Sequence, residues 1–196
     1  MKLLLASRNA HKLEEIRSIF VVPGLAVVTT AAYPDLPEVV EDGVTFEANA
    51  EKKAVCCARA TGEWALADDS GLEVDALDGA PGVRSARYAG EPVDYDANNR
   101  KLLAALAGRS DRAARFRCVI ALSDPAGSVR TVAGVCEGVI ARECRGRHGF
   151  GYDPLFVPAG RAQTFAELAP SVKNAISHRA RALAAAAAAW SGLLAG

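Results

Sequence analysis

The chain has 196 residues, 51% of them hydrophobic, with 23 basic and 23 acidic side chains. This length can bury one sizeable core, and the formal net charge of zero excludes the overall positive field that draws a protein to nucleic acid or to an anionic membrane. We therefore expect no nucleic-acid partner, and the lack of any apolar run near ~20 residues predicts that no segment spans a membrane.

The first half of the sequence predicts strands and helices in alternation. The elements expected are a strand over 2–6, a helix over 11–20, a strand over 25–29, an acidic loop over 34–43, a helix from Thr45 to Gly62, and short strands over 64–67 and 72–74 on either side of an acidic turn over 68–71. In the first helix, Leu13, Ile16 and Phe20 recur at helical spacing. Thr45 can cap the second helix, and Gly62 can end it in the left-handed conformation.

The second half continues this mixture. The elements expected are a helix over 94–107, a strand over 116–122, a turn over 124–127, a strand over 129–140 and a final alanine-rich helix from Ser177 to about residue 194. The two strands around the turn are predicted to form a hairpin. Because strands and helices mix throughout, with no repeat or linker, we expect one α/β domain over residues 1–196 with a mixed sheet.

A first candidate site is the segment from Ser7 to Lys12, between the first strand and the first helix. A helix N-terminus offers unpaired backbone N–H groups and a partial positive charge, which suit a phosphate. Ser7 and Asn9 add short hydrogen-bonding side chains, and Lys12 adds a full charge. The segment lacks the P-loop pattern. The alternative is an ordinary capped helix with a solvated lysine.

A second candidate is the run Asp68-Asp69-Ser70-Gly71, which follows an apolar strand. Ligands of α/β proteins meet the sheet at strand ends. Mg²⁺ takes one or two protein carboxylates together with water and substrate phosphates, so adjacent carboxylates suit it. Glu41 or Asp42 of the preceding loop could supply another carboxylate. The alternatives are an ordinary surface turn and a solvated acidic loop.

A third candidate is the segment from His148 to Pro154. Gly149 and Gly151 let the backbone bend around Phe150, whose ring could stack on a base. Pro154 occupies the place of the third glycine in a dinucleotide-binding pattern, so we do not expect a dinucleotide site. The alternative is an aromatic turn that is buried against the core.

A fourth candidate is the group of Lys173, His178 and Arg179 around the start of the final helix, which Ser177 can cap. The helix dipole disfavours cations at an N-terminus, and a bound anion would relieve that conflict. Local conflicts of this kind are expected at functional sites. The alternative is solvated surface charge.

The order of these segments is more specific than any one of them. The six motifs, in chain order, are Ser-x-Asn-x-x-Lys at 7–12, Thr-Phe-Glu-x-Asn-Ala at 45–50, Ala-Asp-Asp-Ser-Gly-Leu at 67–72, Gly-Ala-Pro-Gly-Val-x-Ser-Ala-Arg-Tyr at 79–88, Gly-Phe-Gly-Tyr-Asp-Pro at 149–154 and Lys-Asn-x-Ile-Ser-His-Arg at 173–179. In this order they resemble the Ham1-like inosine triphosphate pyrophosphatase family, also called dITP/XTP or noncanonical purine NTP pyrophosphatases. The resemblance runs from residue 3 to about residue 183.

The resemblance implies a fold and an activity. The implied fold is α/β, with a mixed, twisted central sheet flanked by helices and two lobes that form a substrate cleft. The implied protein is a homodimer. Its implied activity is the Mg²⁺-dependent hydrolysis of ITP, dITP and XTP to the nucleoside monophosphate and pyrophosphate, which removes them from the nucleotide pool.

The resemblance also implies roles for residues. Asp69 is the implied proton acceptor and metal ligand, with Glu41, or alternatively Asp42, as the second ligand of Mg²⁺. The residues implied to hold the nucleotide are Ser7, Arg8, Asn9, Ala10, His11, Lys12, Ser70, Phe150, Gly151, Tyr152, Asp153, Lys173, His178 and Arg179. Many relatives have glycine where Arg8 stands, so this side chain adds charge and bulk beside the phosphates.

These roles suggest a mechanism and a basis for base selection. We expect Asp69 to deprotonate a water that attacks the α-phosphorus, while Lys12 and Lys173 offset the charge on the leaving pyrophosphate. Hypoxanthine and xanthine present an acceptor at O6 and a donor at N1, which fit Arg179 and Asp153. Adenine reverses both polarities and would leave buried groups unpaired.

Three further expectations follow from the sequence. The nearest rival function is a Maf-type pyrophosphatase with pyrimidine or modified-nucleotide substrates. A nucleotide-binding module without catalytic activity is another alternative, which the intact Asp-Asp-Ser-Gly run disfavours. The odd count of five cysteines, without metal-binding spacing, predicts free thiols in a reducing cytoplasm.

Overall fold

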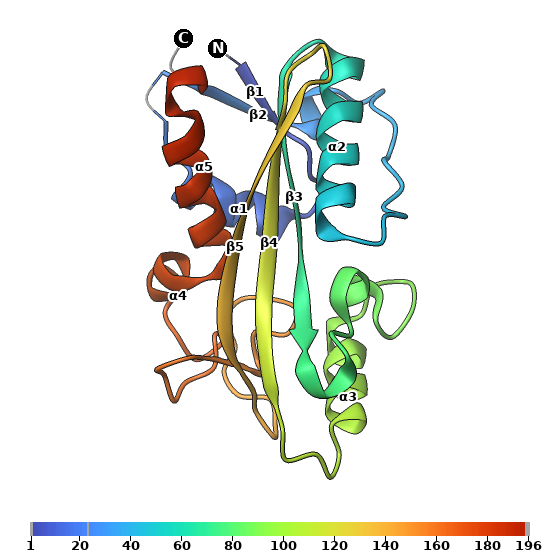
Figure 1. The fold of residues 1–196 in the computed structure, drawn as a ribbon, viewed down its shortest axis with the longest axis vertical. Helices are drawn as coiled ribbons and strands as arrows, with labels where there is room; N and C mark the ends of the chain where they lie inside the picture. The colour runs from blue at the N-terminus through green and yellow to red at the C-terminus, as the bar shows by residue number, and fades with distance from the viewer. Residues whose placement is uncertain (1, 23, 195–196) are drawn as a thin grey trace. The chain divides into compact units, whose positions relative to one another are not determined.

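The computed structural model describes residues 2–22 and 24–194. Its strands form one six-stranded sheet in the order β2-β1-β3-β4-β5-β6 (Figure 1). The strands are β1 (Lys2–Leu5), β2 (Ala26–Thr29), β3 (Trp64–Val74), β4 (Ala113–Ser123), β5 (Val129–Ile140) and β6 (Phe156–Pro158). β1 is parallel to both β2 and β3, whereas β5 and β6 are antiparallel. The predicted α/β class with a mixed sheet is therefore confirmed.

Local sequence signals set the ends of the helices. The helices are α1 (Ala10–Ile19), α2 (Phe46–Thr61), α3 (Tyr95–Ala105), α4 (Pro170–Ile176) and α5 (His178–Leu194), with 3-10 segments η1 (Thr30–Ala32), η2 (Asp75–Leu77) and η3 (Gly82–Arg87). The side chains of Asn9, Thr45 and Asp94 each accept a backbone N–H in the first turn of α1, α2 and α3. Gly62 ends α2 with a φ of 71°, as the sequence predicts.

The acidic run 68–71 was predicted as a turn between two short strands, and this is wrong. β3 continues through it as a single strand from Trp64 to Val74. Asp68 and Asp69 are buried within this strand, where a carboxylate is tolerated because cations neutralise it. Those cations come from segments far away in the sequence, so the local composition alone indicated a turn.

Several short elements were not predicted. They are η1, η2, η3, β6 and α4. α4 has Pro170 at its start, a position where proline is tolerated because its missing N–H would have no helical partner. These elements have three to seven residues, which is too short for a clear hydrophobic period.

Contacts along the chain divide it into two compact units. Unit 1 comprises Met1–Asp69, Cys118–Gly134 and Arg179–Gly196, and unit 2 comprises Ser70–Arg117 and Val135–His178. The single domain over residues 1–196 and the substrate cleft between two lobes stay predictions. Among the residues that the structure describes, no helix has the length and apolar character that a membrane crossing requires.

The core of unit 1 is formed by helices on the sheet. Side chains of β1 and β3, such as Leu5 and Leu66, pack with Ile16 of α1 and Leu183 of α5. Trp190 of α5 is buried in the same cluster, and Trp64 packs against it. α2 lies on the other side of the strands from α5 (Figure 1). The strands of this unit therefore lie between helices (Figure 1).

The core of unit 2 is aromatic. The ring centroids of Phe116 and Phe156 are 4.7 Å apart, and those of Phe156 and Phe165 are 5.1 Å apart. These distances lie in the range of favourable aromatic pairs. The cluster also contains Leu102 of α3, so it fixes this helix against the strands.

Candidate active site

The turn from β1 to α1 has the geometry of a phosphate-binding helix start. The Asn9 side chain accepts the backbone N–H of Lys12 at 3.2 Å, and the Ser7 hydroxyl accepts that of Asn9 at 3.2 Å. Ala10 and His11 in the first helical turn are exposed. The structure therefore brings the six predicted residues 7–12 together at one helix N-terminus, where a phosphate oxygen can meet backbone N–H groups.

Arg8 makes contacts that the sequence did not indicate. Its guanidinium donates to the Leu36 carbonyl oxygen at 2.9 Å and lies 3.9 Å from a Glu38 carboxylate oxygen. Both partners belong to the acidic loop over 34–43. Arg8 therefore fastens this loop to the β1–α1 turn, and its role beside a phosphate stays a prediction.

Asp68 is a fully buried counter-ion for two cations. Its Oδ2 atom lies 3.1 Å from the Lys12 ammonium and 3.1 Å from the Arg179 guanidinium. Burial alone would raise the pKa of this carboxyl, but Lys12, Arg179 and Lys53 outweigh burial and hold the pKa below its usual range. Asp68 is therefore ionised in the folded chain and is occupied by these partners.

Arg179 is joined to α1 as well. Its guanidinium donates to both Asp68 and Glu15, and its side chain is 1% exposed. The sequence predicts that the cations around the start of α5 conflict with the helix dipole and that a bound anion would relieve this conflict. For Arg179 this is wrong, because the carboxylates of Asp68 and Glu15 already neutralise it.

Asp69 faces a different set of partners. One carboxylate oxygen accepts the Asn49 amide at 3.1 Å, and the other lies 3.6 Å from the Lys53 ammonium. Burial is the largest influence on the Asp69 carboxyl, and it raises the pKa. The charges of Lys53 and Lys12 lower this pKa, whereas the charge of Glu41 raises it. The net result is a pKa above the usual value. A raised pKa suits a proton acceptor that has to work near neutral pH.

Glu41 meets Asp69 through a shared cation. The Lys53 ammonium lies 2.7 Å from a Glu41 carboxylate oxygen and also donates to the Asp68 carbonyl oxygen at 2.7 Å. Burial alone would lower the pKa of Lys53, yet the surrounding carboxylates hold it above its usual value. A positive charge is therefore stabilised between Glu41 and Asp69.

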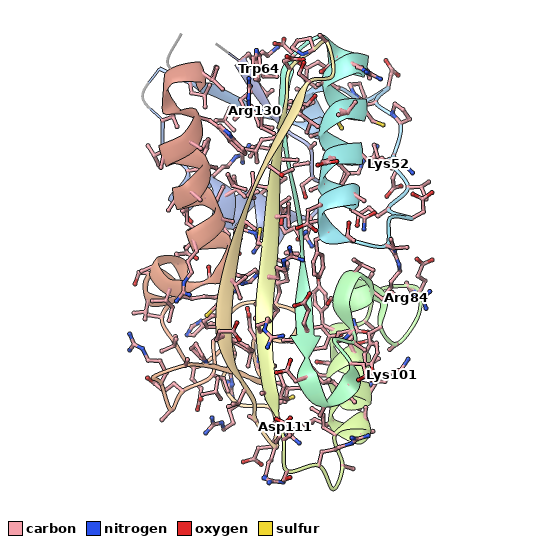
Figure 2. All side chains as sticks on the ribbon, viewed as in Figure 1. Lys52, Trp64, Arg84, Lys101, Asp111 and Arg130 are labelled. Carbon is pink, nitrogen blue, oxygen red and sulfur yellow. The ribbon has the colours of Figure 1, made fainter. Side chains whose placement is uncertain are left out.

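These two carboxylates fit the ligand set of a magnesium ion. Mg²⁺ binds to one or two carboxylates and fills the rest of its octahedron with water and phosphate oxygens. In the described part of the chain, no cluster of three or more His, Cys, Asp or Glu residues has the geometry of a metal site. A metal here would therefore rely on the substrate for part of its coordination. Asp42, the alternative ligand, is exposed and pairs with Lys52 at 2.6 Å on the outer side of α2 (Figure 2).

In unit 2, the predicted aromatic turn is held by its own aspartate. The Asp153 carboxylate accepts the backbone N–H of Phe150 at 2.9 Å and the Lys173 ammonium at 2.5 Å. Lys173 also lies 5.1 Å from the centre of the Phe150 ring. Gly149 has a φ of 75°, and a Cβ there would lie 1.9 Å from the Asp153 carboxylate. Glycine is required at this position by both conformation and space.

The remaining predicted residues of unit 2 lie in or beside its core. The Tyr152 hydroxyl donates to the Ser85 carbonyl oxygen at 2.9 Å, and burial raises the pKa of Tyr152. The His178 ring stacks on Phe116 with centroids 4.6 Å apart. Ser70 is the first residue of unit 2 and is partly exposed. Binding of nucleotide by these residues stays a prediction.

Three polar residues that were not predicted as site residues lie at the site. They are Asn49, Lys53 and Glu15. Asn49 and Lys53 are four residues apart on α2, so both lie on the helix face that is buried against β3. Their polarity on a buried face was a signal in the sequence, and Asn49 belongs to the motif at 45–50.

The comparisons with known proteins agree with this geometry. The family model described as the Ham1 family matches residues 3–189. The chain belongs to the Ham1 family. A relative in Desulforamulus reducens, a dITP/XTP pyrophosphatase, is 57% identical over 185 residues, which are 93% of this chain and 92% of that protein. A Geobacter sulfurreducens protein of the same name is 52% identical over 185 residues, covering 93% of each chain.

The Ham1 fold itself is seen in a solved structure. The Staphylococcus aureus Ham1 protein superposes with a TM-score of 0.90 at 40% sequence identity, covering 98% of this chain and 100% of that chain. The predicted membership and fold are thereby confirmed. In this Ham1 chain, polar and charged groups are gathered at the β1–α1 turn and β3 of unit 1, and at the aromatic turn of unit 2.

Proposed function

We propose that this Ham1-family chain hydrolyses the noncanonical purine nucleoside triphosphates ITP, dITP and XTP to the monophosphate and pyrophosphate. The observation that carries the proposal is that the carboxylates of Glu41 and Asp69 both lie beside the single positive charge of the Lys53 ammonium. In the same unit, the β1–α1 turn offers the helix N-terminus that a triphosphate needs. The dITP/XTP pyrophosphatases of Desulforamulus reducens and Geobacter sulfurreducens, similar over more than nine-tenths of the chain, support this substrate class.

Glu41 and Asp69 are the residues that would hold Mg²⁺. The ion would supply Lewis-acid polarisation of the phosphate oxygens. Asp68 does not suit a third ligand, because its side chain is 0% exposed and its Oδ2 atom already pairs with Lys12 and Arg179. The metal site therefore uses one carboxylate from β3 and one from the loop that Arg8 fastens.

Each side chain of the site has its own role in the hydrolysis. Asp69 accepts the proton of a water whose oxygen forms a bond to the α-phosphorus, while the bond from that phosphorus to the pyrophosphate oxygen breaks. Lys12 and Lys53 offset the negative charge that passes to the leaving pyrophosphate. Asn49 orients the Asp69 carboxylate through its amide donor.

The base is assigned to the aromatic turn of unit 2. Phe150 stacks on the purine, and Asp153 accepts from its N1–H. Because Asp153 is held by the Lys173 ammonium and the Phe150 backbone N–H, its position is set before the base arrives. Such prior positioning lowers the entropic cost of recognition.

The test is pyrophosphate release with Mg²⁺ across ITP, XTP, dITP, GTP and ATP, with dTTP and CTP added to detect a Maf-type preference. We expect kcat/KM for ITP and XTP to exceed that for ATP by at least about 100-fold, because adenine would leave buried polar groups unpaired. Equal turnover of ATP and ITP, or a preference for pyrimidines, would contradict the proposal. Binding without pyrophosphate release would indicate a module without catalytic activity.

The assembly and the location of the protein are proposals as well. A homodimer, implied by the family resemblance, predicts a particle of twice the mass of one chain in sedimentation experiments. A cytoplasmic location is supported by the cysteines, since all five are free thiols in the structure. Burial raises the pKa of Cys118 to about 12, so this thiol is unreactive at neutral pH.

A further inference from the structure

α3 presents two side chains to the aromatic turn of unit 2. Tyr95 and Asn99 are four residues apart, so they lie on the same face of the helix. The Asn99 amide donates to the Gly151 carbonyl oxygen at 2.9 Å. The ring centroids of Tyr95 and Phe150 are 6.0 Å apart with an interplanar angle of 47°. The helix therefore contacts both the backbone of the turn and the ring that the turn carries.

The carbonyl oxygen of the Asn99 side chain adds nothing to the stability of the fold. Asn99 is 4% exposed, and its Oδ1 atom has no hydrogen-bond partner within residues 2–22 and 24–194. An acceptor that is buried without a partner destabilises the folded state, which an apolar side chain of similar volume would avoid. The gain from this asparagine is its bond to Gly151.

The neighbouring Asn98 shows what a structural asparagine looks like on the same helix. Its Oδ1 atom accepts the backbone N–H of Ala89 at 2.6 Å, and its amide donates to the Ala86 carbonyl oxygen at 2.8 Å. Both ends of this side chain are satisfied by residues 85–89, and none of its hydrogen bonds reaches the backbone of the aromatic turn. Asn98 and Asn99 thus form a matched pair, of which one member stabilises the fold.

We propose that Tyr95 and Asn99 are positioning residues for the purine base. Gly149 and Gly151 both have left-handed φ values, and the Asp153 carboxylate holds the backbone N–H of Phe150 between them but not Gly151. Asn99 fixes the backbone at Gly151, and Tyr95 supports the Phe150 ring from the side. This inference rests on the proposed function, because it requires that the base stacks on Phe150.

The experiment compares Asn99→Leu with Asn98→Leu. The KM for ITP, the inhibition constant of inorganic tripolyphosphate and the midpoint of thermal unfolding are measured for each. In Asn99→Leu the KM should rise about tenfold, since stacking of a base on an aromatic ring contributes at about this level. Its tripolyphosphate inhibition constant should not change, and its unfolding midpoint should fall by less than that of Asn98→Leu, since only the bond to Gly151 is lost. Asn98→Leu should lower the midpoint and keep the wild-type KM.

A second pair of variants tests the ring. Tyr95→Leu should raise the KM for ITP without changing tripolyphosphate inhibition, and Tyr95→Phe should recover most of the loss because it retains the ring. The proposal is overturned if Asn99→Leu and Tyr95→Leu leave the KM unchanged, or if they weaken tripolyphosphate as much as ITP.

The same variants separate this proposal from the proposed function. If the wild-type protein hydrolysed none of the nucleotides, the proposed function would fail, and calorimetric titration with ITP would still measure base binding. A Kd for ITP that rises in Asn99→Leu and stays constant in Asn98→Leu would then support the positioning role. Equal Kd values in wild type and Asn99→Leu would refute it.

Discussion

Asp68 and Asp69 are adjacent on β3, yet their carboxylates serve different partners. Asp68 receives Lys12 and Arg179, whereas Asp69 receives the Asn49 amide and lies beside Lys53. Successive side chains of a strand point to opposite faces, so the two carboxylates separate without any turn. The pKa of one is lowered and the pKa of the other is raised. This divergence supports a structural charge at Asp68 and the proposed catalytic role of Asp69.

The first prediction concerns the proton acceptor. Asp69→Asn should lower kcat for ITP by about 10²–10⁴-fold, because the amide cannot take the proton of the attacking water. The fold should persist, since burial already disfavours the charge of Asp69. Pyrophosphate release and a circular-dichroism melt would check the two parts. A variant that keeps wild-type kcat would remove Asp69 from the mechanism.

The second prediction concerns the cation between the carboxylates. Lys53→Met leaves Glu41 and Asp69 without their shared ammonium, and breaking a buried ion pair costs roughly 3–5 kcal/mol. Added Mg²⁺ should then raise the unfolding midpoint of this variant by more than it raises that of the wild type. Lys52→Met is the matched control, because its exposed pair with Asp42 should matter little. An equal Mg²⁺ effect in wild type and Lys53→Met would argue against a metal at these carboxylates.

The third prediction concerns acid stability. The pKa of Asp68 in the folded chain lies below the ~3.9 of an unfolded chain, so in that window the unfolded state binds more protons. The stabilisation from Asp68 is therefore fully present above about pH 4 and is lost as the pH falls through the folded-state pKa. Asp69, with its raised pKa, contributes in the opposite direction.

Urea denaturation of wild type and Asp68→Asn at several pH values between about 2 and 7 would check this prediction. The variant should be less stable at neutral pH, and the difference between the two proteins should shrink as the pH falls below about 4. A constant difference over the whole range would show that the charge of Asp68 is not what stabilises the fold.

The fourth prediction concerns the aromatic turn. Gly149→Ala should be more damaging than Gly151→Ala, although both glycines have left-handed φ values. Each alanine costs about 1–2 kcal/mol for its backbone conformation. Only at Gly149 would the new Cβ also displace the Asp153 carboxylate, since nothing lies within 4 Å of a Cβ at Gly151. Denaturation midpoints and the KM for ITP would rank the variants, and equal effects would contradict the structure.

Much of the fold could be predicted because its signals are local. Thr45 and Gly62 act on backbone groups within four residues, so sequence alone could identify both ends of α2. The continuity of β3 could not be predicted, because the cations that make Asp68 and Asp69 tolerable in a strand come from other segments.

Part of the candidate site was predictable for the same reason. The segment 7–12 was predicted from its place between a strand and a helix and from its short polar side chains, and the aromatic turn from its two glycines. Lys53 was missed because a lysine on a helix is ordinarily assigned to solvent. Its burial depends on Glu41, Asp68 and Asp69, which lie 12 to 16 residues away in the sequence.

The two tryptophans of the chain, Trp64 and Trp190, both belong to unit 1. Indole fluorescence therefore reports on the β1–α1–α5 half alone, while backbone circular dichroism samples both halves. Recording the two signals during one thermal scan therefore measures whether the two units unfold cooperatively. Coincident curves would mean that both units unfold in one transition, and separated curves would mean that they unfold one after the other.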